Sequence, residues 1–521
     1  MKRIAFIVIS LLTASVLFAS LLLNRNLNDT YKRVNPADRK STNWIYDTPD
    51  TNADGVPDFK VIPLSPGIYQ IVFSIGPGLI EKAAAHIGGS ITAADWRTVQ
   101  GRSVAFANTT KGGGVLNVSI RLKGGKEITA KPGVYSLHPR SAGGGSSFTE
   151  INNGQFTASE GGCAVYGDID GDGDLDIIMT GWAGTAKITK LYLNNGLGSF
   201  TEGNSAQFSQ VYPSTGGSKS CAFGDVDNDG DLDLLITGTD NSSGYHANVY
   251  RNDGGGVFTE ISAGQIAPVT VSSASFGDID NDGNLDLIVT GGNPFAFTPG
   301  GFRSKIYRNT GGGIFTEIHT GTLIDSGGGN NVLGDIDGDN DLDLIITSAN
   351  ATTGYAAAVY TNAGNGSFGL KTSTLTPVSQ SAAVLGDIDN DGDLDLVISG
   401  DTGAGYKTIV YTNTGTGVFS TLSTTMLTGT YNGALSFGHI TSDNNLDVLL
   451  TGNSGGPVGV SKIYSNDGSG GFIEILSGSL TNVFYGFSIM FDADNDGDCD
   501  VFLGGSPSNT TRTVRMFRNN P

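Results

Sequence analysis

From residue 148 onward the chain alternates short apolar runs with turns rich in glycine and asparagine. One unit of this pattern has four runs: 220–223, which ends at an acidic loop; 232–237; 249–252, which ends in Tyr-x-Asn; and 258–260, which begins with Phe. Runs of this length between turn residues predict β-strands. Four consecutive antiparallel strands joined by short turns are typical of one blade of a β-propeller.

The unit repeats seven times, and its acidic loops follow one another at spacings of 57, 53, 57, 52, 52 and 53 residues. A fixed period of this size predicts a repeat architecture. The repeats begin with a fourth-strand run at Phe148 and stop just after a third-strand run at Asn519. We therefore expect an all-β, seven-bladed propeller in which the run at Phe148 completes the last blade. Such closure leaves no exposed sheet edge between the chain ends.

The loop between the first and second strand reads GDIDGDGDLD in the first repeat, from Gly167 to Asp176. The alternating Asp168, Asp170 and Asp172 can turn inward around one ion, and Asp176 closes the loop at position nine. Gly173, at position six, permits a left-handed turn. Oxygen-only ligation by a flexible loop favours Ca²⁺ over Zn²⁺ or a transition metal. The predicted cofactor is therefore calcium, about six ions in the propeller.

Five further loops repeat this arrangement of acids, and a similar segment, 50–58, lies nearer the N-terminus. The candidate metal ligands are Asp168, Asp170, Asp172, Asp174 and Asp176; Asp225, Asp227, Asp229, Asp231 and Asp233; Asp278, Asp280, Asp282, Asn284 and Asp286; Asp335, Asp337, Asp339, Asp341 and Asp343; Asp387, Asp389, Asp391, Asp393 and Asp395; Asp492, Asp494, Asp496, Asp498 and Asp500; and Asp50, Asn52, Asp54 and Asp58. The sixth loop reads GHITSDNNLD, so it has lost two of four carboxylates and is expected to bind metal weakly or not at all.

The formal net charge is −21, and most of the acids lie in these loops. The chain has no run of Lys or Arg, so we do not expect nucleic acid as a partner. Three cysteines allow one disulfide at most. Cys163 and Cys221 lie on equivalent neighbouring strands but one residue out of phase, which should turn them to opposite sheet faces. The expectation is therefore buried free thiols.

The N-terminal part differs in composition from the repeats. Lys2 and Arg3 precede an uncharged run, so residues 1–23 are predicted to be a signal peptide or an uncleaved signal anchor. The second alternative is the only route by which we expect contact with a membrane. Residues 24–59 form a polar linker, 60–140 a small β-rich domain with a short helix near 80–86, 141–147 a Gly/Ser linker, and 148–521 the propeller. The protein is expected to be secreted or on the cell surface.

The recurring aspartate loops resemble the FG-GAP/VCBS repeats of integrin α-subunit heads and many bacterial surface proteins, over residues 148–521. The resemblance implies a seven-bladed propeller with structural calcium in the hairpins between the first and second strands. It also implies that partners bind the opposite face. Relatives with these repeats have diverse activities, so the fold alone does not assign one.

Loops on the face opposite the aspartates vary in length and carry aromatic residues, namely Trp182, Tyr212, Tyr245, Phe295, Phe297, Phe302, Tyr355, Tyr406 and Tyr431. Repetition of tyrosine at one register fits either packing at the strand start or a contact rim. The leading hypothesis is an adhesion or binding module for an extracellular protein or glycan, without enzymatic activity. A carbohydrate-active enzyme or a lipase-like accessory propeller is one alternative, and a purely structural surface component is another.

Overall fold

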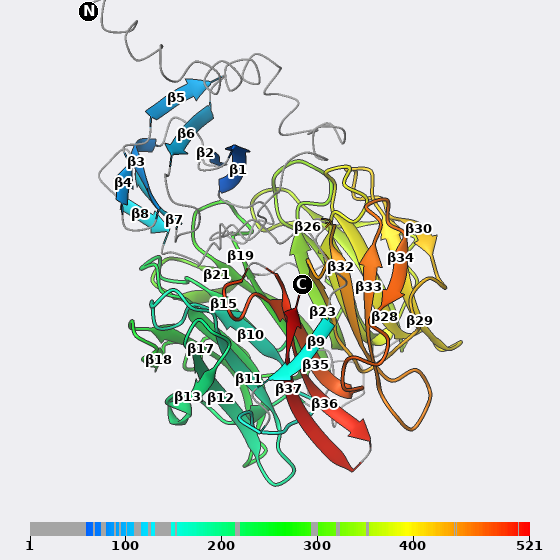
Figure 1. The fold of residues 1–521 in the computed structure, drawn as a ribbon. Coiled ribbons are helices and arrows are strands. Elements are labelled where there is room, and N and C mark those ends of the chain that lie inside the picture. Colours follow the sequence, from blue (N-terminus) through cyan, green and yellow to red (C-terminus); the bar gives the residue numbers. More distant parts are fainter. Residues whose placement is uncertain are drawn as a thin grey trace, which may run out of the picture. The chain divides into compact units, whose positions relative to one another are not determined.

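A computed structural model describes the chain as two compact units (Figure 1). It describes the backbone of eight strands between residues 59 and 130, and residues 147–520 except 152–153, 214–218, 293–300, 319–322, 351–353, 442, 444, 497 and 509. Within the described residues no helix is long and apolar enough to cross a membrane. The predicted signal segment and the acidic segment 50–58 lie outside the described residues.

The first unit contains two four-stranded antiparallel sheets, ordered β1-β2-β6-β5 and β4-β3-β7-β8. Their bounds are β1 (Phe59–Ser65), β2 (Ile68–Phe73), β3 (Ile80–Ile87), β4 (Ser90–Thr92), β5 (Asp95–Val99), β6 (Arg102–Asn108), β7 (Leu116–Leu122) and β8 (Glu127–Ala130). The helix expected near 80–86 is wrong, because this alanine-containing segment is the strand β3 and pairs with β7. Tertiary pairing here overrides helix propensity.

The second unit is a propeller of seven sheets. In chain order the strands are β9 (Ser147–Ile151); β10 (Ala164–Gly167), β11 (Asp176–Trp182), β12 (Lys187–Asn194), β13 (Phe200–Glu202); β14 (Val211–Tyr212), β15 (Cys221–Gly224), β16 (Asp233–Asp240), β17 (Tyr245–Asn252), β18 (Phe258–Glu260); β19 (Thr270–Gly277), β20 (Asp286–Gly292), β21 (Phe302–Asn309), β22 (Phe315–Ile318); β23 (Ser326–Gly334), β24 (Asp343–Asn350), β25 (Ala356–Asn362), β26 (Phe368–Lys371); β27 (Ser379–Gly386), β28 (Asp395–Asp401), β29 (Tyr406–Thr412), β30 (Ser420–Ser423); β31 (Leu435–Gly438), β32 (Asp447–Gly452), β33 (Val460–Asn466), β34 (Phe472–Ile475); and β35 (Phe484–Phe491), β36 (Asp500–Ser508), β37 (Thr511–Asn520). A short 3-10 helix, η1 (Ser205–Gln207), precedes β14.

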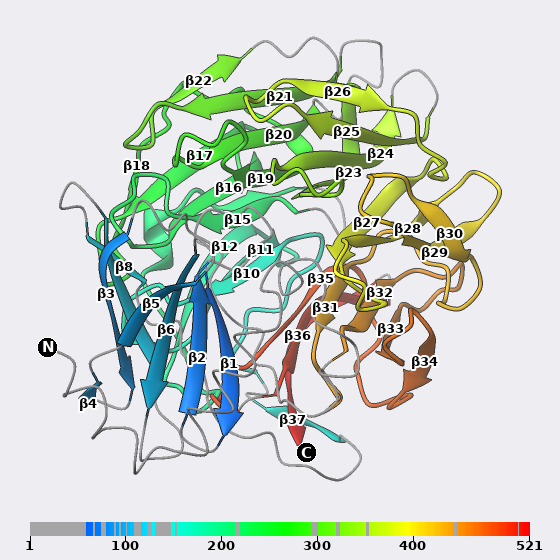
Figure 2. The same cartoon turned by 90° about the horizontal axis from the view of Figure 1, so that it is seen from above.

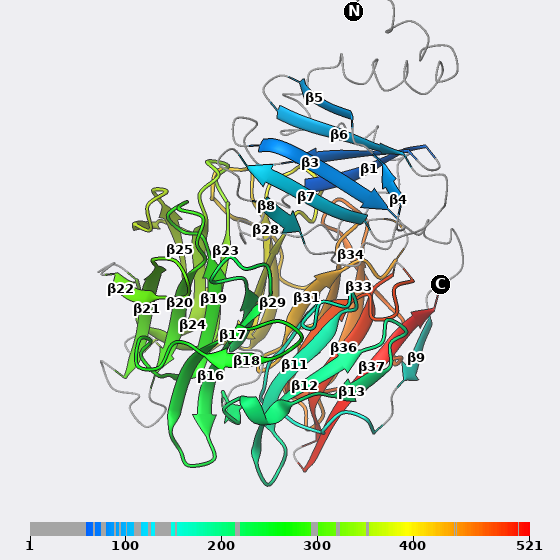
Figure 3. The ribbon, with the colours of Figure 1, turned by 90° about the vertical axis from the view of Figure 1, so that its left-hand side faces the viewer.

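The first strand of each blade is the innermost, and these inner strands contact one another around a closed ring from β10 through β35 (Figure 2). The last blade has the order β35-β36-β37-β9, so its outer strand comes from the start of the repeats. Phe148 pairs with Asn519 in this blade, and β9 runs beside β37 (Figure 3). The predicted ring closure and the all-β, seven-bladed fold are therefore confirmed.

Adjacent blades pack through apolar side chains from facing sheets. One such cluster joins Ile178 and Leu191 of the first blade to Leu234 and Tyr250 of the second, and all four are buried. Burial of large aliphatic and aromatic side chains between blades is the main favourable term that holds the ring together. Position eight contributes to these layers in several loops, as Leu285 does in the third blade.

The expectation of free thiols at Cys163 and Cys221 is wrong, because the structure joins them in a disulfide with a Cα–Cα distance of 6.1 Å. The two residues do lie on opposite faces of equivalent strands. In a propeller, however, one face of a blade meets the opposite face of the next, so opposite faces bring them together between the first two blades. Cys499 is buried and belongs to no disulfide. Disulfides persist in oxidising compartments outside the cytoplasm.

Candidate metal centre

The loops between the first and second strand of each blade fold around their own backbone amides. In the first loop, Asp168 accepts hydrogen bonds from the amides of Gly171 (2.8 Å) and Gly173 (3.2 Å). Asp172 accepts one from the amide of Asp174, at 2.9 Å. The backbone at Gly173 is left-handed, with φ 96°, as predicted, and Asn340 takes the same role with φ 70°. These turns point successive carboxylates into one concave loop.

The carboxylates converge as the sequence predicts. Among the residues that the structure describes, six groups of at least three acidic side chains have oxygen atoms within 4.8 Å of one another. Five of them are Asp168, Asp170 and Asp176; Asp225, Asp227 and Asp229; Asp278, Asp280 and Asp282; Asp335, Asp337 and Asp339; and Asp387, Asp389 and Asp395. Like charges this close repel unless a proton or a cation lies between them. The arrangement could therefore hold metal ions such as Ca²⁺.

A buried oxygen at position three supports this fit independently. Asp227, Asp280, Asp337 and Asp494 each keep one carboxylate oxygen that is buried and has no hydrogen-bond partner among the described residues. A buried, unpaired charged oxygen is costly. All other candidate donors in the loops are also oxygens, which is the ligand set that Ca²⁺ prefers. The residues present therefore fit a hard cation.

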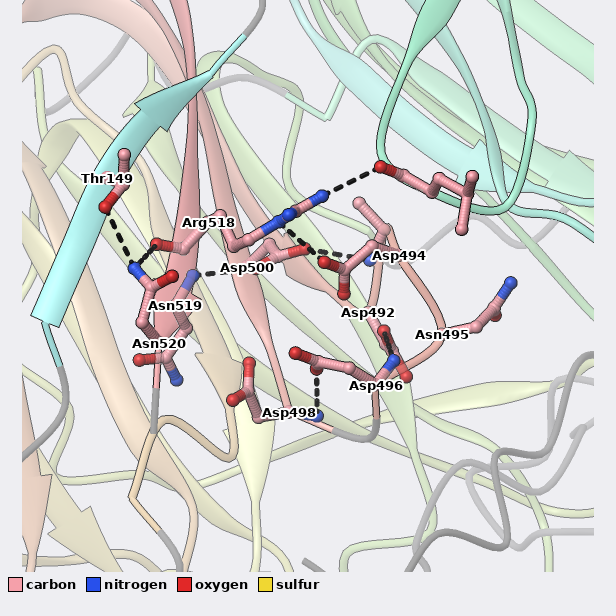
Figure 4. Close-up of polar contacts among 12 residues, drawn as sticks. Thr149, Asp492, Asp494, Asn495, Asp496, Asp498, Asp500, Arg518, Asn519 and Asn520 are labelled. Carbon is pink, nitrogen blue, oxygen red and sulfur yellow. Dashed lines mark hydrogen bonds and ion pairs between the residues drawn. The ribbon is translucent and has the colours of Figure 1, made fainter. Parts of the chain in front are cut away.

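In four blades the other oxygen of position three faces a basic side chain. These ion pairs are Arg251–Asp227 (4.0 Å), Arg308–Asp280, Lys371–Asp337 (3.6 Å) and Arg518–Asp494 (2.6 Å). Figure 4 shows the last of these, where Arg518 also donates to the carbonyl oxygen of Leu197 (2.8 Å). The first and fifth loops have no such ion pair at position three in the described structure. A bound cation would therefore have to neutralise more of the carboxylate charge in these two loops than in the other four.

Position nine has a second role that the sequence did not predict. Asp176 is fully buried, and it accepts hydrogen bonds from the amides of Ile169 (2.9 Å) and Asn194 (2.8 Å). Asn194 in turn donates its side-chain amide to the carbonyl of Ala493 in the neighbouring blade, at 2.8 Å. The same pair recurs in every blade, as Asp233 with Asn252, Asp286 with Asn309, Asp343 with Asn362, Asp395 with Asn413, Asp447 with Asn466 and Asp500 with Asn519. We call this pair the Asp–Asn clamp.

The clamp links each loop to the preceding blade. Asn252 donates to the carbonyl of Ile169, and Asn519 donates to the carbonyl of Ile440. The recurrence of Asn at the end of Tyr-x-Asn was visible in the sequence, but its partner lies about eighty residues away, 83 for Asn252 and 79 for Asn519. Only the ring geometry reveals that contact.

Position seven turns sideways rather than inward. The side chain of Asp174 accepts a hydrogen bond from Asn495 of the last blade (3.0 Å), and Asp341 accepts one from Asn281 (2.7 Å). Asn284 likewise accepts from Asn228, at 3.1 Å. The donors sit at position four with left-handed backbone, which Asn tolerates. These side chains therefore join adjacent loops, and the candidate ligand atom at position seven is the backbone carbonyl.

The sixth loop is closed by its own hydrogen bonds. The hydroxyl of Thr441, at position three, donates to Asp443 (2.8 Å) and to Asp447 (3.2 Å). His439, at position one, makes a contact of 3.1 Å between its Nδ1 and the carbonyl of Asn445. Neutral side chains thus occupy two positions that are carboxylates elsewhere, and weak or absent metal binding remains the prediction for this loop.

Burial raises the pKa of the position-nine carboxyls and of several others in the loops, and neighbouring acids add to the effect. The pKa of Asp168 and Asp225 rises to about 6 from an ordinary 3.8. At position nine the pKa rises to about 7 for Asp176 and Asp395 and to about 8 for Asp500. Without a cation, the folded loops therefore hold protons that the unfolded chain would release.

The metal-free protein is expected to become less stable as the pH rises from 5 to 8. Folded-state pKa values of about 6 to 8 lie above the ordinary 3.8, so this stabilisation is complete below 3.8 and is lost as the pH passes the folded values. With calcium the trend should reverse, because protons compete with the cation. Melting temperatures in chelator and in calcium across this pH range would test it. Parallel curves would contradict it.

The structure is a seven-bladed propeller whose carboxylate loops share one face. Its repeats are FG-GAP-like: that family's profile matches residues 168–236, 225–289 and 335–398. The residues that carry the resemblance in the sequence are thus those that build the loops. A search of curated proteins found none that matches the chain.

The comparison with solved structures gives matches of low sequence identity. Rhamnogalacturonan lyase PL11 of Bacillus licheniformis is 12% identical with a TM-score of 0.38, over 88% of this chain and 89% of that chain. AofleA from Arthrobotrys oligospora is 10% identical with a TM-score of 0.35, over 65% of this chain and 92% of that chain. A mutant of AofleA gives 10% and 0.36 over the same shares.

Proposed function

We propose that the protein is an extracytoplasmic binding module whose propeller is stabilised by calcium and whose ligand is a protein or a glycan. The observation that carries the proposal is the segregation of the two faces. Every described aspartate loop lies where a second strand begins, and the aromatic residues lie at the other end of the second strands. Some stand in the turn to the third strand, whereas Tyr212 and Tyr431 precede inner strands and pair with Thr239 and Asn453 at the ends of second strands. Across the turns to the third strand, Trp182 pairs with Lys187, and Asp401 pairs with Tyr406. Loops on a rigid scaffold are where binding usually occurs.

Stacked aromatic side chains support a contact surface on this second face. Tyr406 and Tyr431 stack with ring centroids 4.1 Å apart, across the junction between two blades. Trp182 and Tyr212 lie 6.4 Å apart between the first two blades. Phe302 is buried and is thus part of the core, while Phe295 and Phe297 lie outside the described residues. Aromatic rings with one polar end are frequent anchors in binding sites.

The disulfide between the first two blades and the FG-GAP-like repeats support an extracytoplasmic location, secreted or on the cell surface. The proposal includes no catalytic step. Histidine is the commonest general acid or base, and His246 contacts Asp240 at 2.9 Å through an exposed turn. This histidine–carboxylate contact is the observation that favours the alternative of a carbohydrate-active enzyme.

A glycan array probed with the full chain in calcium tests the proposal. We expect selective binding without turnover, and at least about a tenfold loss when Tyr431→Ala removes one stacked ring. Tyr166→Ala is the matched control, because Tyr166 is an exposed aromatic residue at the loop end of β10. A parallel screen of extracellular proteins covers the second ligand class. Cleavage of a bound glycan would favour the enzyme, and silence in both screens would favour a structural component.

A further inference from the structure

Asparagine at position four of the acidic loops directs its side chain to the next blade. The second, third, fifth and seventh loops carry it, as Asn228, Asn281, Asn390 and Asn495. Each has a left-handed backbone, with φ between 58° and 61°. Residues other than glycine rarely adopt this conformation, and asparagine is among those that do so at the least cost. In all four loops the side-chain amide donates a hydrogen bond to the loop that follows in the ring.

The four side-chain amides contact the same position of the following loop. Asn281 donates to the carboxylate of Asp341, at position seven of the fourth loop, at 2.7 Å. The other three make the same contact, namely Asn495 with Asp174 (3.0 Å), Asn228 with Asn284 (3.1 Å) and Asn390 with Asn445 (3.1 Å). Position seven is also the residue whose backbone carbonyl is the candidate ligand. We call these four contacts the asparagine bridges.

The asparagine bridges divide the loops into groups. They join the second loop to the third and the third to the fourth, the fifth to the sixth, and the seventh to the first. The first and fourth loops carry Gly171 and Gly338 at position four, and glycine has no side chain to form a bridge. Position four of the sixth loop, Ser442, lies outside the described residues. The bridges therefore leave gaps between the first and second loops and between the fourth and fifth.

Each end of the bridge between the third and fourth loops lies beside candidate metal ligands. Asn281 stands between Asp280 and Asp282, two of the three converging carboxylates of the third loop. The side chain of Asp280 is 6% exposed, and its Oδ1 has no hydrogen-bond partner among the described residues. Asp341 follows two residues after Asp339, one of the converging carboxylates of the fourth loop. One hydrogen bond thus connects two candidate metal centres.

We propose that the asparagine bridges couple calcium binding between neighbouring loops, so that the loops of one group fill together and different groups fill independently. A loop that is ordered by its cation holds position seven still, and position seven holds the asparagine of the preceding loop. The preceding loop then loses less conformational entropy when it binds its own ion, which makes the coupling positive. The proposal rests on the calcium-stabilised propeller proposed above and deepens it.

Calcium-binding curves of the metal-free full chain, measured by isothermal titration, test the coupling. Asn281→Gly removes the bridge between two loops that both have converging carboxylates. Glycine adopts the left-handed backbone readily, so the fold should remain. We expect the second ion of this pair to bind about fivefold more weakly, at the lower end of usual couplings, because the bridge is solvent-exposed.

Asn390→Gly is the matched control, because it also removes a bridge and a left-handed asparagine. Its bridge leads to the sixth loop, which has lost two of four carboxylates and is expected to bind calcium weakly or not at all. No second ion is therefore available for coupling, and the binding curve of Asn390→Gly should match that of the unaltered chain.

A substitution in the fourth loop measures the same coupling from the other side. Asp339→Asn removes one converging carboxylate of that loop. It should abolish one ion and weaken the ion of the third loop about fivefold, the same coupling factor. In a chain that also carries Asn281→Gly, Asp339→Asn should abolish one ion and leave the other affinities unchanged, because the two loops no longer interact.

The number of bound ions distinguishes failure of the coupling from failure of calcium binding itself. A saturating metal count near zero, by mass spectrometry, would overturn both the coupling and the calcium-stabilised propeller. A count of about six, as the six groups of carboxylates predict, with identical curves for Asn281→Gly and the unaltered chain would overturn the coupling alone. Equal weakening by Asn281→Gly and Asn390→Gly would do the same.

Discussion

Removal of calcium with excess chelator is expected to lower the melting temperature of the full chain by on the order of 10 °C. At a hundredfold excess over Kd, each ion that binds only the folded state contributes about 2.7 kcal/mol. Six groups of converging carboxylates make the summed effect large. Without the cation, the buried oxygens of Asp227, Asp280 and their equivalents stay unpaired. Scanning calorimetry, with a metal count by mass spectrometry, measures both the shift and the number of ions.

Single-site variants make this test specific. Asp389→Asn removes one of the three converging carboxylates of the fifth loop. In this loop no basic side chain of the described structure forms an ion pair with position three. It should reduce the metal count by about one and should destabilise only in calcium. Asp443→Asn, in the sixth loop, is the matched control and should change neither. A metal count near zero, together with melting temperatures that are equal with and without chelator, would rule out calcium in the loops.

The second large effect is expected from Asp447→Asn, in the sixth loop, which has lost two of its four carboxylates. Asp447 accepts hydrogen bonds from the amides of Ile440 (3.0 Å), Thr441 (2.9 Å) and Asn466 (3.0 Å). An asparagine has one acceptor oxygen, so its NH₂ group must face a buried amide donor. We expect a loss of about 2–4 kcal/mol, from the cost of one or two unpaired buried groups. Urea unfolding measures it.

This loss should be the same in calcium and in chelator, which separates the Asp–Asn clamp from metal binding. Asn466→Ala should have a similar effect, because it removes the donor to the carbonyl of Ile388 in the preceding blade (2.7 Å). Asp443→Asn serves again as the control, since its carboxylate is exposed. If Asp447→Asn unfolds like the unaltered protein in chelator, position nine has no architectural role of its own.

The sequence predicts the ring and its closure well because both depend on counting. The run at Phe148 has no third-strand run before it, and the run at Asn519 has no fourth-strand run after it, so the two must pair. The convergence of Asp168 and Asp170 also follows from spacing alone, since alternate residues of a tight loop face one side.

The spacing of residues along the sequence does not predict the contacts between blades. The partner of Asn194 is the carbonyl of Ala493, and 299 residues separate them. Cys163 and Cys221 were assigned to opposite faces correctly, but the conclusion failed because those faces meet between blades.

The closing strand β9 also decides how force would pass through the molecule. It is the outer strand of its blade, and it is joined to the ring through five residue pairs with β37. In the sequence, β9 is the first strand of the propeller after the N-terminal unit. A pull on the N-terminus while a partner holds the propeller would therefore load this short ladder before any other blade. Under such a load we expect the ring to open first between β9 and β37, where its two ends meet.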